Sequence, residues 1–151
     1  MTQEEKELLL KDLCSRLPYR VKGCADHGAF KGIVTLRNIN IDNDSQPIAC
    51  YNDYGSLHVK VSEFKPYLFP LSSMTEEQFN ELKSYVDLKY EHNTLELVEW
   101  DSNYKTLEFW LEEIPSYHVI KVFDWLNKNH FDYRNLIPKG LAKDATGLNI
   151  Y

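Results

Sequence analysis

Cysteine is scarce in this chain, and the three that occur, Cys14, Cys24 and Cys50, are odd in number and far apart. A disulfide framework needs paired cysteines and a zinc ribbon needs two close pairs, so this spacing excludes both. Thiols that stay reduced are typical of the cytoplasm. We therefore expect three free, buried thiols, no bound metal and a cytoplasmic protein.

Long hydrophobic runs are missing as well. The apolar run nearest the first residue is Leu8–Leu10, which is far shorter than the core of a signal peptide. No stretch approaches the roughly 18 apolar residues of a membrane-spanning helix. The sequence therefore predicts a soluble chain that is not secreted and has no membrane partner.

Glycine is sparse, and its six positions never form the glycine-rich loops that bind phosphate. The nucleophile elbow Gly-x-Ser-x-Gly is absent, and no two histidines stand at a metal-binding spacing. These absences disfavour nucleotide-dependent enzymes, α/β-hydrolases and metalloenzymes. We expect no cofactor, and we favour a protein that is not an enzyme.

Basic residues are fewer than acidic ones: the chain has 17 basic and 23 acidic side chains, which give a net charge of −6. The deficit is concentrated in residues 75–114, which carry eleven acidic and three basic side chains. Sequence-independent binding to nucleic acid depends on clustered lysine and arginine, so direct nucleic-acid binding is not expected. We interpret the acidic segment as a solvated surface. The alternative is an acidic mimic of nucleic acid, which requires its carboxylates to lie on one face.

What the sequence does contain is a composition suited to a packed core. Of its 151 residues, 43% are hydrophobic and 26% are charged, close to the globular average. A chain of this length buries roughly 70% of its unfolded surface, so it folds without metal or crosslink. No linker or internal repeat interrupts it, and we predict a single domain over residues 1–151.

The first half predicts a helix followed by a meander of strands. Thr2 and Glu5 have the spacing of a capping box, and leucines recur every three or four residues up to Pro18, which indicates a helix over about residues 3–17. Short β-branched and aromatic runs separated by turn residues follow. The four expected antiparallel strands are Tyr19–Ala25, Phe30–Ile41, Pro47–Asn52 and Leu57–Phe64.

The second half predicts two helices on either side of a hairpin. Pro66 and Pro70 should break regular structure, after which Ser73 or Thr75 can cap a helix. Residues 94–113 fit either a hairpin that turns at residues 101–103 or a helix, and we prefer the hairpin. A last helix starts at about residue 115 and ends near residue 130. The expected buried stripes are Phe79, Leu82 and Val86 in the first helix and Val119, Val122, Phe123 and Leu126 in the second.

This order of elements predicts an α+β fold, because strands come in runs and do not alternate with helices. It consists of an N-terminal helix, a four-strand antiparallel meander, a helix, a β-hairpin and a C-terminal helix. The irregular segment Phe131–Ala142 is rich in apolar side chains and should fold back over the core as a clamp. Arg134 is then expected to be held by a carboxylate or by carbonyls at a helix end.

The densest polar cluster follows the last helix. His130 could act as a base oriented by Asp132, with Arg134 or Lys139 binding an anion. The same residues suit a structural role, because a cation is favoured at a helix C-terminus and Arg134 can pair with Asp132. We prefer the structural role, so no catalytic residue is assigned and His130, Asp132 and Arg134 remain weak candidates.

Three further residues near this cluster are candidates for binding a partner, namely Trp125, Tyr133 and Lys139. Trp125 lies off the centre of the apolar stripe of its helix, so part of its indole is expected to reach the surface. No set of metal ligands is assigned.

Four blocks of the sequence together resemble a family of small uncharacterised proteins from anaerobic gut bacteria and their phages or other mobile elements. The blocks are residues 10–19, 65–77 (KPYLFPLSSMTEE), 123–142 (FDWLNKNHFDYRNLIPKGLA) and 144–151. The resemblance implies no activity and no catalytic residue. It implies a genomic setting in which small accessory regulators and inhibitors are common. Asn135 stands where the resembling proteins have glycine, which asparagine can replace if the backbone is left-handed there.

We therefore expect a non-enzymatic protein-interaction or regulatory accessory module of a phage or mobile element, whose partner is another protein. Ten tyrosines and three tryptophans support this hypothesis, because these residue types are favoured at protein contacts. The alternatives are an enzyme with a site around His130, Asp132 and Arg134, and an acidic inhibitor that mimics nucleic acid.

Overall fold

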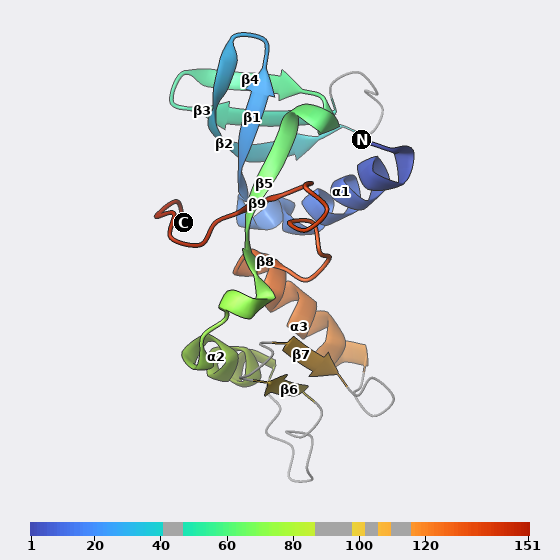
Figure 1. The fold of residues 1–151 in the computed structure, drawn as a ribbon, viewed down its shortest axis with the longest axis vertical. Coiled ribbons are helices and arrows are strands. Elements are labelled where there is room, and N and C mark those ends of the chain that lie inside the picture. The colour runs from blue at the N-terminus through green and yellow to red at the C-terminus, as the bar shows by residue number, and fades with distance from the viewer. Residues whose placement is uncertain (41–46, 87–97, 102–105, 110–115) are drawn as a thin grey trace. The chain divides into compact units, whose positions relative to one another are not determined.

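The chain forms two compact units in the computed structural model, shown in Figure 1. Unit 1 comprises Met1–Leu68 and Arg134–Tyr151, and unit 2 comprises Phe69–Tyr133. The order of helices and strands confirms the expected α+β fold, while the single-domain expectation stays a prediction. The structure describes residues 1–40, 47–86, 98–101, 106–109 and 116–151.

Helix α1 (Gln3–Arg16) begins as the sequence predicts. The Thr2 backbone donates to the Glu5 carboxylate (2.7 Å) and the Glu5 backbone donates to the Thr2 hydroxyl (3.2 Å), which completes a capping box. A 3-10 turn, η1 (Leu17–Tyr19), continues the helix and ends at Arg20 in the left-handed conformation, with φ of 53°. The first predicted strand is therefore wrong at its start, because this turn occupies Tyr19.

Four strands follow in antiparallel order and confirm the meander. The first two pair from Lys22↔Thr35 to His27↔Phe30, and the third pairs with the fourth from Ile48↔Val59 to Asn52↔Gly55. The fourth strand ends earlier than predicted, because a 3-10 turn, η2 (Val61–Glu63), replaces its last residues. The strands are β1 (Lys22–His27), β2 (Phe30–Ile39), β3 (Ile48–Asn52) and β4 (Gly55–Val59).

A fifth strand, β5 (Phe64–Pro70), corrects the expectation that Pro66 and Pro70 break regular structure. Proline removes one backbone donor, so a strand tolerates it wherever the ladder does not need that N–H group. β5 pairs antiparallel with β1 and parallel with two short strands, β8 (Phe131–Asp132) and β9 (Lys143–Asp144). The strand order is β4-β3-β2-β1-β5-β8, with β9 also on β5.

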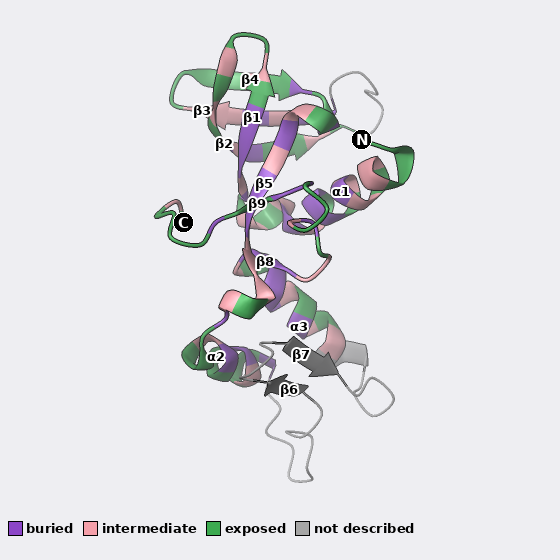
Figure 2. Cartoon of the chain, in the orientation of Figure 1, coloured by how far each residue is buried: buried purple, intermediate pink, exposed green. Residues whose placement is uncertain are grey.

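The core of unit 1 lies between α1 and the inner side of this sheet, where the buried residues of Figure 2 concentrate. Leu9 and Leu13 of α1 are fully buried there, together with Phe64 at the start of β5. The C-terminal segment completes this core, because Leu136 is fully buried and Leu141 is 4% exposed. This arrangement confirms the expected clamp.

Unit 2 contains two helices and a hairpin. Helix α2 (Glu76–Val86) starts at the capping box that Thr75 and Gln78 form, and it buries Phe79, Leu82 and Val86 as predicted. Strands β6 (Val98–Asp101) and β7 (Thr106–Phe109) pair antiparallel, which confirms the hairpin over these residues. Its expected turn falls largely outside the described residues.

Helix α3 (Ser116–Lys128) buries Val122 and Leu126, in agreement with the predicted stripe. Two aromatic residues of the same helix differ from the prediction. Phe123 is 39% exposed, whereas Trp125 is only 1% exposed and stacks on Phe131 with ring centroids 5.7 Å apart. The expectation that part of the Trp125 indole reaches the surface is therefore wrong. Phe131, which follows α3 in the sequence, stacks on the indole and covers it.

None of the described helices is long and apolar enough to cross a membrane.

Candidate interaction site

The predicted polar cluster is divided between the two units. His130 follows α3 in a left-handed conformation (φ 59°) and is 8% exposed. Its backbone N–H donates to the carbonyl of Asn127 (3.2 Å), and its carbonyl accepts from the N–H of Phe69 (2.9 Å). Asp132 is 4% exposed and lies in β8, opposite Pro70 of β5. These backbone contacts give both residues a place in the fold of unit 2.

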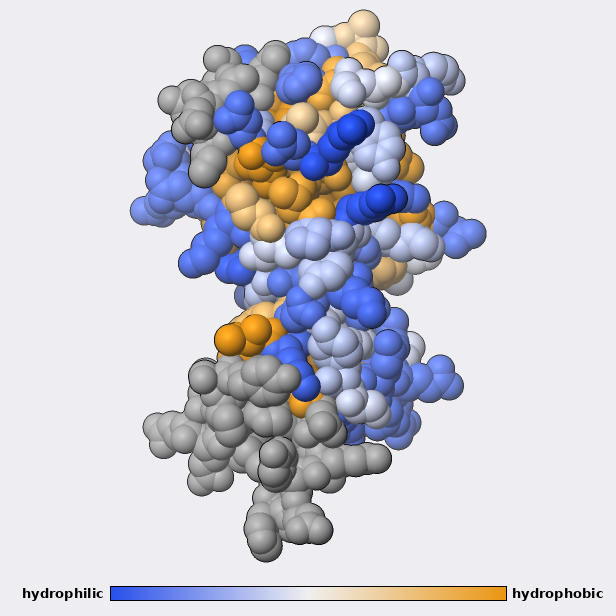
Figure 3. Space-filling model, turned by 180° about the vertical axis from the view of Figure 1, so that it is seen from behind, coloured by the Kyte–Doolittle hydropathy of each residue, from blue (hydrophilic) through white to orange (hydrophobic). Residues whose placement is uncertain are grey.

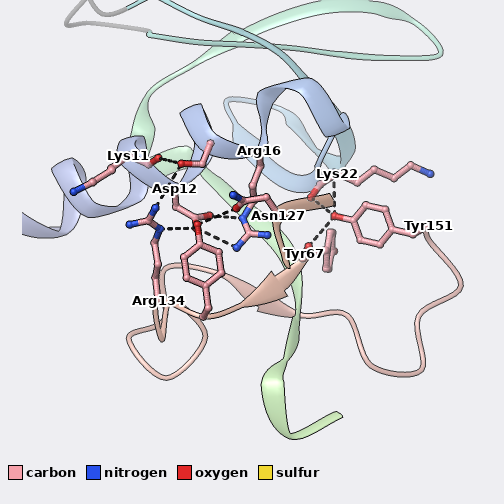
Figure 4. A network of polar contacts seen from close by, with 10 residues as sticks. Lys11, Asp12, Arg16, Lys22, Tyr67, Asn127, Arg134 and Tyr151 are labelled. Carbon is pink, nitrogen blue, oxygen red and sulfur yellow. Dashed lines mark hydrogen bonds and ion pairs between the residues drawn. The ribbon is translucent and has the colours of Figure 1, made fainter. Parts of the chain in front are cut away.

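Arg134 belongs to unit 1, where it contacts two side chains near the C-terminal end of α1. Its Nε lies 3.3 Å from Oδ1 of Asp12, and its Nη2 donates to the hydroxyl of Ser15 (3.5 Å). Asp12 also pairs with Arg16 at 2.7 Å, and Asp12 and Arg16 are both fully buried. Figure 4 shows the two guanidinium groups converging on this carboxylate. The expectation that a carboxylate holds Arg134 is confirmed.

The three binding candidates lie in different surroundings. Trp125 is buried, and Tyr133 donates from its hydroxyl to the side-chain oxygen of Asn127 (3.0 Å) while its ring contacts Phe123. Lys139 is exposed in a turn that the N–H of Gly140 closes onto the carbonyl of Ile137 (2.9 Å). The structure does not gather these three side chains into one described pocket.

Among the described residues no three His, Cys, Asp or Glu side chains are placed to hold a metal ion. Half of the acidic segment, residues 75–114, lies outside the described residues, so the expectation that its carboxylates share one face stays a prediction.

A different site emerges on the outer face of the sheet. Side chains alternate along each strand, so Val34 and Leu36 of β2 point into the core while Ile33 and Thr35 point outward. Thr35 pairs with Lys22 of β1 on one side and with Tyr51 of β3 on the other. A row of outward-facing side chains therefore crosses three strands.

A β-bulge adds Arg37 to this face. Leu36 pairs with Cys50 and Asn38 with Ala49, so Arg37 is the extra residue between two pairs. Its guanidinium carbon lies 5.9 Å from the centroid of the Tyr51 ring, a cation–π contact. The bulge thus directs one cation over the aromatic ring.

Two open hollows share Tyr51, and we call them together the Tyr51 surface. The first has a volume of about 340 Å³ and is lined by Leu17, Pro18, Arg20, Leu36, Arg37 and Tyr51. The second has a volume of about 240 Å³ and is lined by Lys22, Ile33, Val34, Thr35, Tyr51, Asn52 and Asp53. Leu36 is buried beneath the first hollow, and Ile33 is 49% exposed at the second. Both hollows thus combine apolar surface with cations.

The three cations of the Tyr51 surface are not neutralised by the part of the chain that the structure describes. Within the described residues, Arg20, Lys22 and Arg37 form no ion pair shorter than 4.0 Å. Among the described residues that line the two hollows, these three cations face one carboxylate, that of Asp53, so this lining is locally positive on an acidic protein.

The backbone of Arg20 places this residue at the rim of the first hollow. Its φ of 53° is the left-handed conformation that ends η1, and its N–H donates to the carbonyl of Leu17 (3.4 Å). A long side chain in this conformation costs of order 1 kcal/mol. Arg20 is exposed there and lines the hollow.

Unit 1 also carries apolar surface. Several side chains around its core are only partly buried, among them Leu10, Leu17 and Ile39. Seen from behind, unit 1 presents an area of hydrophobic residues within a border of hydrophilic ones (Figure 3). The described residues that line the two hollows combine tyrosine and arginine with apolar side chains, a mixture that is typical of protein-binding surfaces.

Sequence reasoning missed Arg20, Lys22, Arg37 and Tyr51. Alternation in Phe30–Ile39 could have placed Ile33, Thr35 and Arg37 on one face. The register between strands brings Tyr51 and Lys22 beside Thr35, and this register has no signal in the sequence.

Comparison of the chain with protein-family models, with curated proteins and with solved structures finds no match.

Proposed function

We propose that the protein is a non-enzymatic interaction module that binds another protein through the Tyr51 surface. The observation that carries the proposal is the group of three cations without an ion-pair partner in the described chain, set around two adjoining hollows with apolar walls. Protein interfaces combine apolar area with tyrosine and arginine in this way. The resemblance to small proteins of phages and mobile elements supports a role as a cytoplasmic accessory protein.

The enzyme alternative has less support. Arg134 is engaged by the buried carboxylate of Asp12, and His130 and Asp132 are both buried beside β5. Substrate-binding groups usually converge on a concave, accessible pocket. None of the described pockets is lined by these three residues.

A capture experiment with matched baits tests the proposal. The baits are the unaltered protein, the double variant Arg20→Glu/Arg37→Glu and the control Lys11→Glu, each incubated with an extract of host cells. We expect the unaltered protein and Lys11→Glu to retain the same partner, and the double variant to lose it. The control reverses an exposed cation of the same unit outside the Tyr51 surface.

Two results would overturn the proposal. One is capture of no protein by the unaltered bait, and the other is equal capture by the double variant. Thermal melts of all three baits establish that each is folded. If Arg37→Glu disturbs the bulge, Arg37→Gln removes the charge with a smaller change in shape.

A further inference from the structure

We infer that the Tyr51 surface takes an extended acidic segment of the partner, in which apolar side chains alternate with carboxylates. The inference rests on the proposed function and specifies the chemistry of the partner. Two features of the surface carry it, namely the distribution of the cations and the apolar walls of the hollows.

The cations stand at both ends of the surface. Arg20 and Arg37 line the first hollow, and Lys22 lines the second, while Tyr51 separates them. A ligand that meets all three must therefore extend across Tyr51. Arginine binds carboxylate through two parallel hydrogen bonds, so Arg20 and Arg37 can each hold one acidic side chain.

Apolar side chains line the same hollows as these cations. The half-buried Leu17 and the exposed Pro18 line the first hollow, and the half-exposed Ile33 lines the second. A purely anionic ligand would leave this area in contact with water. A segment that carries an apolar side chain beside each carboxylate covers this area, and removing apolar surface from water favours binding.

Single-stranded nucleic acid fits the surface less well. Such ligands bind by stacking successive bases on exposed aromatic rings, and among the described residues Tyr51 is the one aromatic side chain that lines either hollow. The guanidinium of Arg37 already lies over this ring. The net charge of −6 also repels a polyanion at long range, whereas a short acidic segment of a protein meets mainly the local cations.

Fluorescence anisotropy with labelled peptides tests the inference on the full chain. The probe is a fluorescein-labelled peptide of glutamates with interspersed leucines. The comparison probes replace every leucine by glycine or every glutamate by lysine, and a labelled oligothymidine represents nucleic acid. We expect the glutamate–leucine peptide to bind most tightly, and added salt to weaken its binding.

Variants locate the binding on the chain. Arg20→Glu/Arg37→Glu should weaken binding of the glutamate–leucine peptide by about tenfold or more, since two charge-assisted contacts become repulsive. Ile33→Ser should weaken this peptide but not the glycine-substituted one. Lys11→Glu, which reverses an exposed cation outside the Tyr51 surface, should bind both peptides as the unaltered protein does.

Failure of the inference and failure of the proposed function are distinguishable. Equal binding of the leucine and glycine peptides would remove the apolar requirement, and tighter binding of oligothymidine would identify nucleic acid as the ligand. Either result, or no binding of any peptide, overturns the inference. The proposed function still stands if the capture experiment shows a partner that depends on Arg20 and Arg37.

Discussion

Asp12 is the residue whose removal should cost unit 1 most. Its carboxylate is fully buried and is shared by Arg16 at 2.7 Å and Arg134 at 3.3 Å. Replacing Asp12 by Asn leaves two guanidinium groups without their counter-charge. We expect a loss of about 3–5 kcal/mol in the free energy of unfolding, as for other buried ion pairs broken at one partner. Urea denaturation measures it.

Glu7→Gln is the matched control for Asp12, because Glu7 is an exposed carboxylate on the same helix. It should change the free energy of unfolding by less than about 0.5 kcal/mol. A loss for Asp12→Asn as small as the control's would show that the network contributes little. A double-mutant cycle of Asp12→Ala with Arg134→Ala then gives the coupling between α1 and the C-terminal segment.

Glu63 makes stability depend on pH. Its carboxylate accepts from the backbone N–H of Lys60 (2.9 Å) and pairs with His27 (2.9 Å), and these contacts, the backbone hydrogen bond foremost, hold its pKa below the ordinary value of 4.5. A carboxyl whose pKa is lower in the folded state adds stability above the unfolded pKa and loses it as the pH falls. We therefore expect Glu63→Gln to lower the melting temperature at pH 7 and to have a shrinking effect below about pH 4.5. Melts between pH 3 and pH 7 test this, and a difference that grows towards acid pH would contradict it.

The three cysteines should differ in reactivity. All are free thiols, but Cys14 is exposed, which corrects the expectation that all three are buried: it lies on the solvent side of α1, next to the inward-facing Leu13. Burial raises the pKa of the Cys50 thiol to about 11, so it stays protonated and unreactive at neutral pH. We expect iodoacetamide to modify Cys14 in the native protein and to reach Cys50 only after unfolding. Peptide mass spectrometry reads this out, and rapid native labelling of Cys50 would contradict it.

At the scale of elements, the C-terminal segment is part of the core and not an appendage. Phe131 is 1% exposed in unit 2, and Leu136 and Ala145 are fully buried in unit 1. The backbone of this segment also bonds to β5, as in the donation from the Ala145 N–H to the carbonyl of Leu68 (2.8 Å). Asn135 takes a φ of 56°, a left-handed conformation that asparagine adopts more readily than most other residues with a side chain.

Truncation before Phe131 should therefore unfold the protein. Each large apolar side chain that it removes contributes about 1.5–3 kcal/mol, a large share of a total of roughly 5–15 kcal/mol. Circular dichroism should show no cooperative melt. Leu136→Ala is the milder variant, with an expected loss of about 2–5 kcal/mol, and Leu148→Ala is its exposed control. A truncated chain that kept its melting temperature and lost only its partner would make the segment a recognition element.

At the scale of the molecule, the two units differ in the sign of their net charge. From the sequence, unit 1 carries 12 basic and 10 acidic side chains, and unit 2 carries 5 and 13. The Tyr51 surface thus lies on the unit with the positive balance. An acidic partner segment is attracted to unit 1, and this attraction should weaken as salt is added.

We predict that the chain unfolds in one transition. The backbone passes between the units twice, and β5 contributes residues to both, so loss of β5 pairing disturbs each unit. In calorimetry the van't Hoff and calorimetric enthalpies should agree. Two resolved transitions would show that the units are independent domains and that the single-domain expectation is wrong.

Local rules were enough for much of the fold. The capping boxes of α1 and α2, the meander of β1 to β4 and the hairpin of β6 and β7 follow from spacing, turn residues and alternation, because these patterns act over a few neighbouring residues. The apolar composition of Phe131–Ala142 likewise predicted a buried clamp.

Only the tertiary structure decided what depends on distant segments. β5 was missed because its partners β1, β8 and β9 lie far away in sequence, and the same distance hid Asp12 as the partner of Arg134. The Tyr51 surface depends on strand register and on one bulge, and a shift of one residue would turn its side chains into the core. Composition and local pattern thus determined the elements, while the pairing of strands determined the surface.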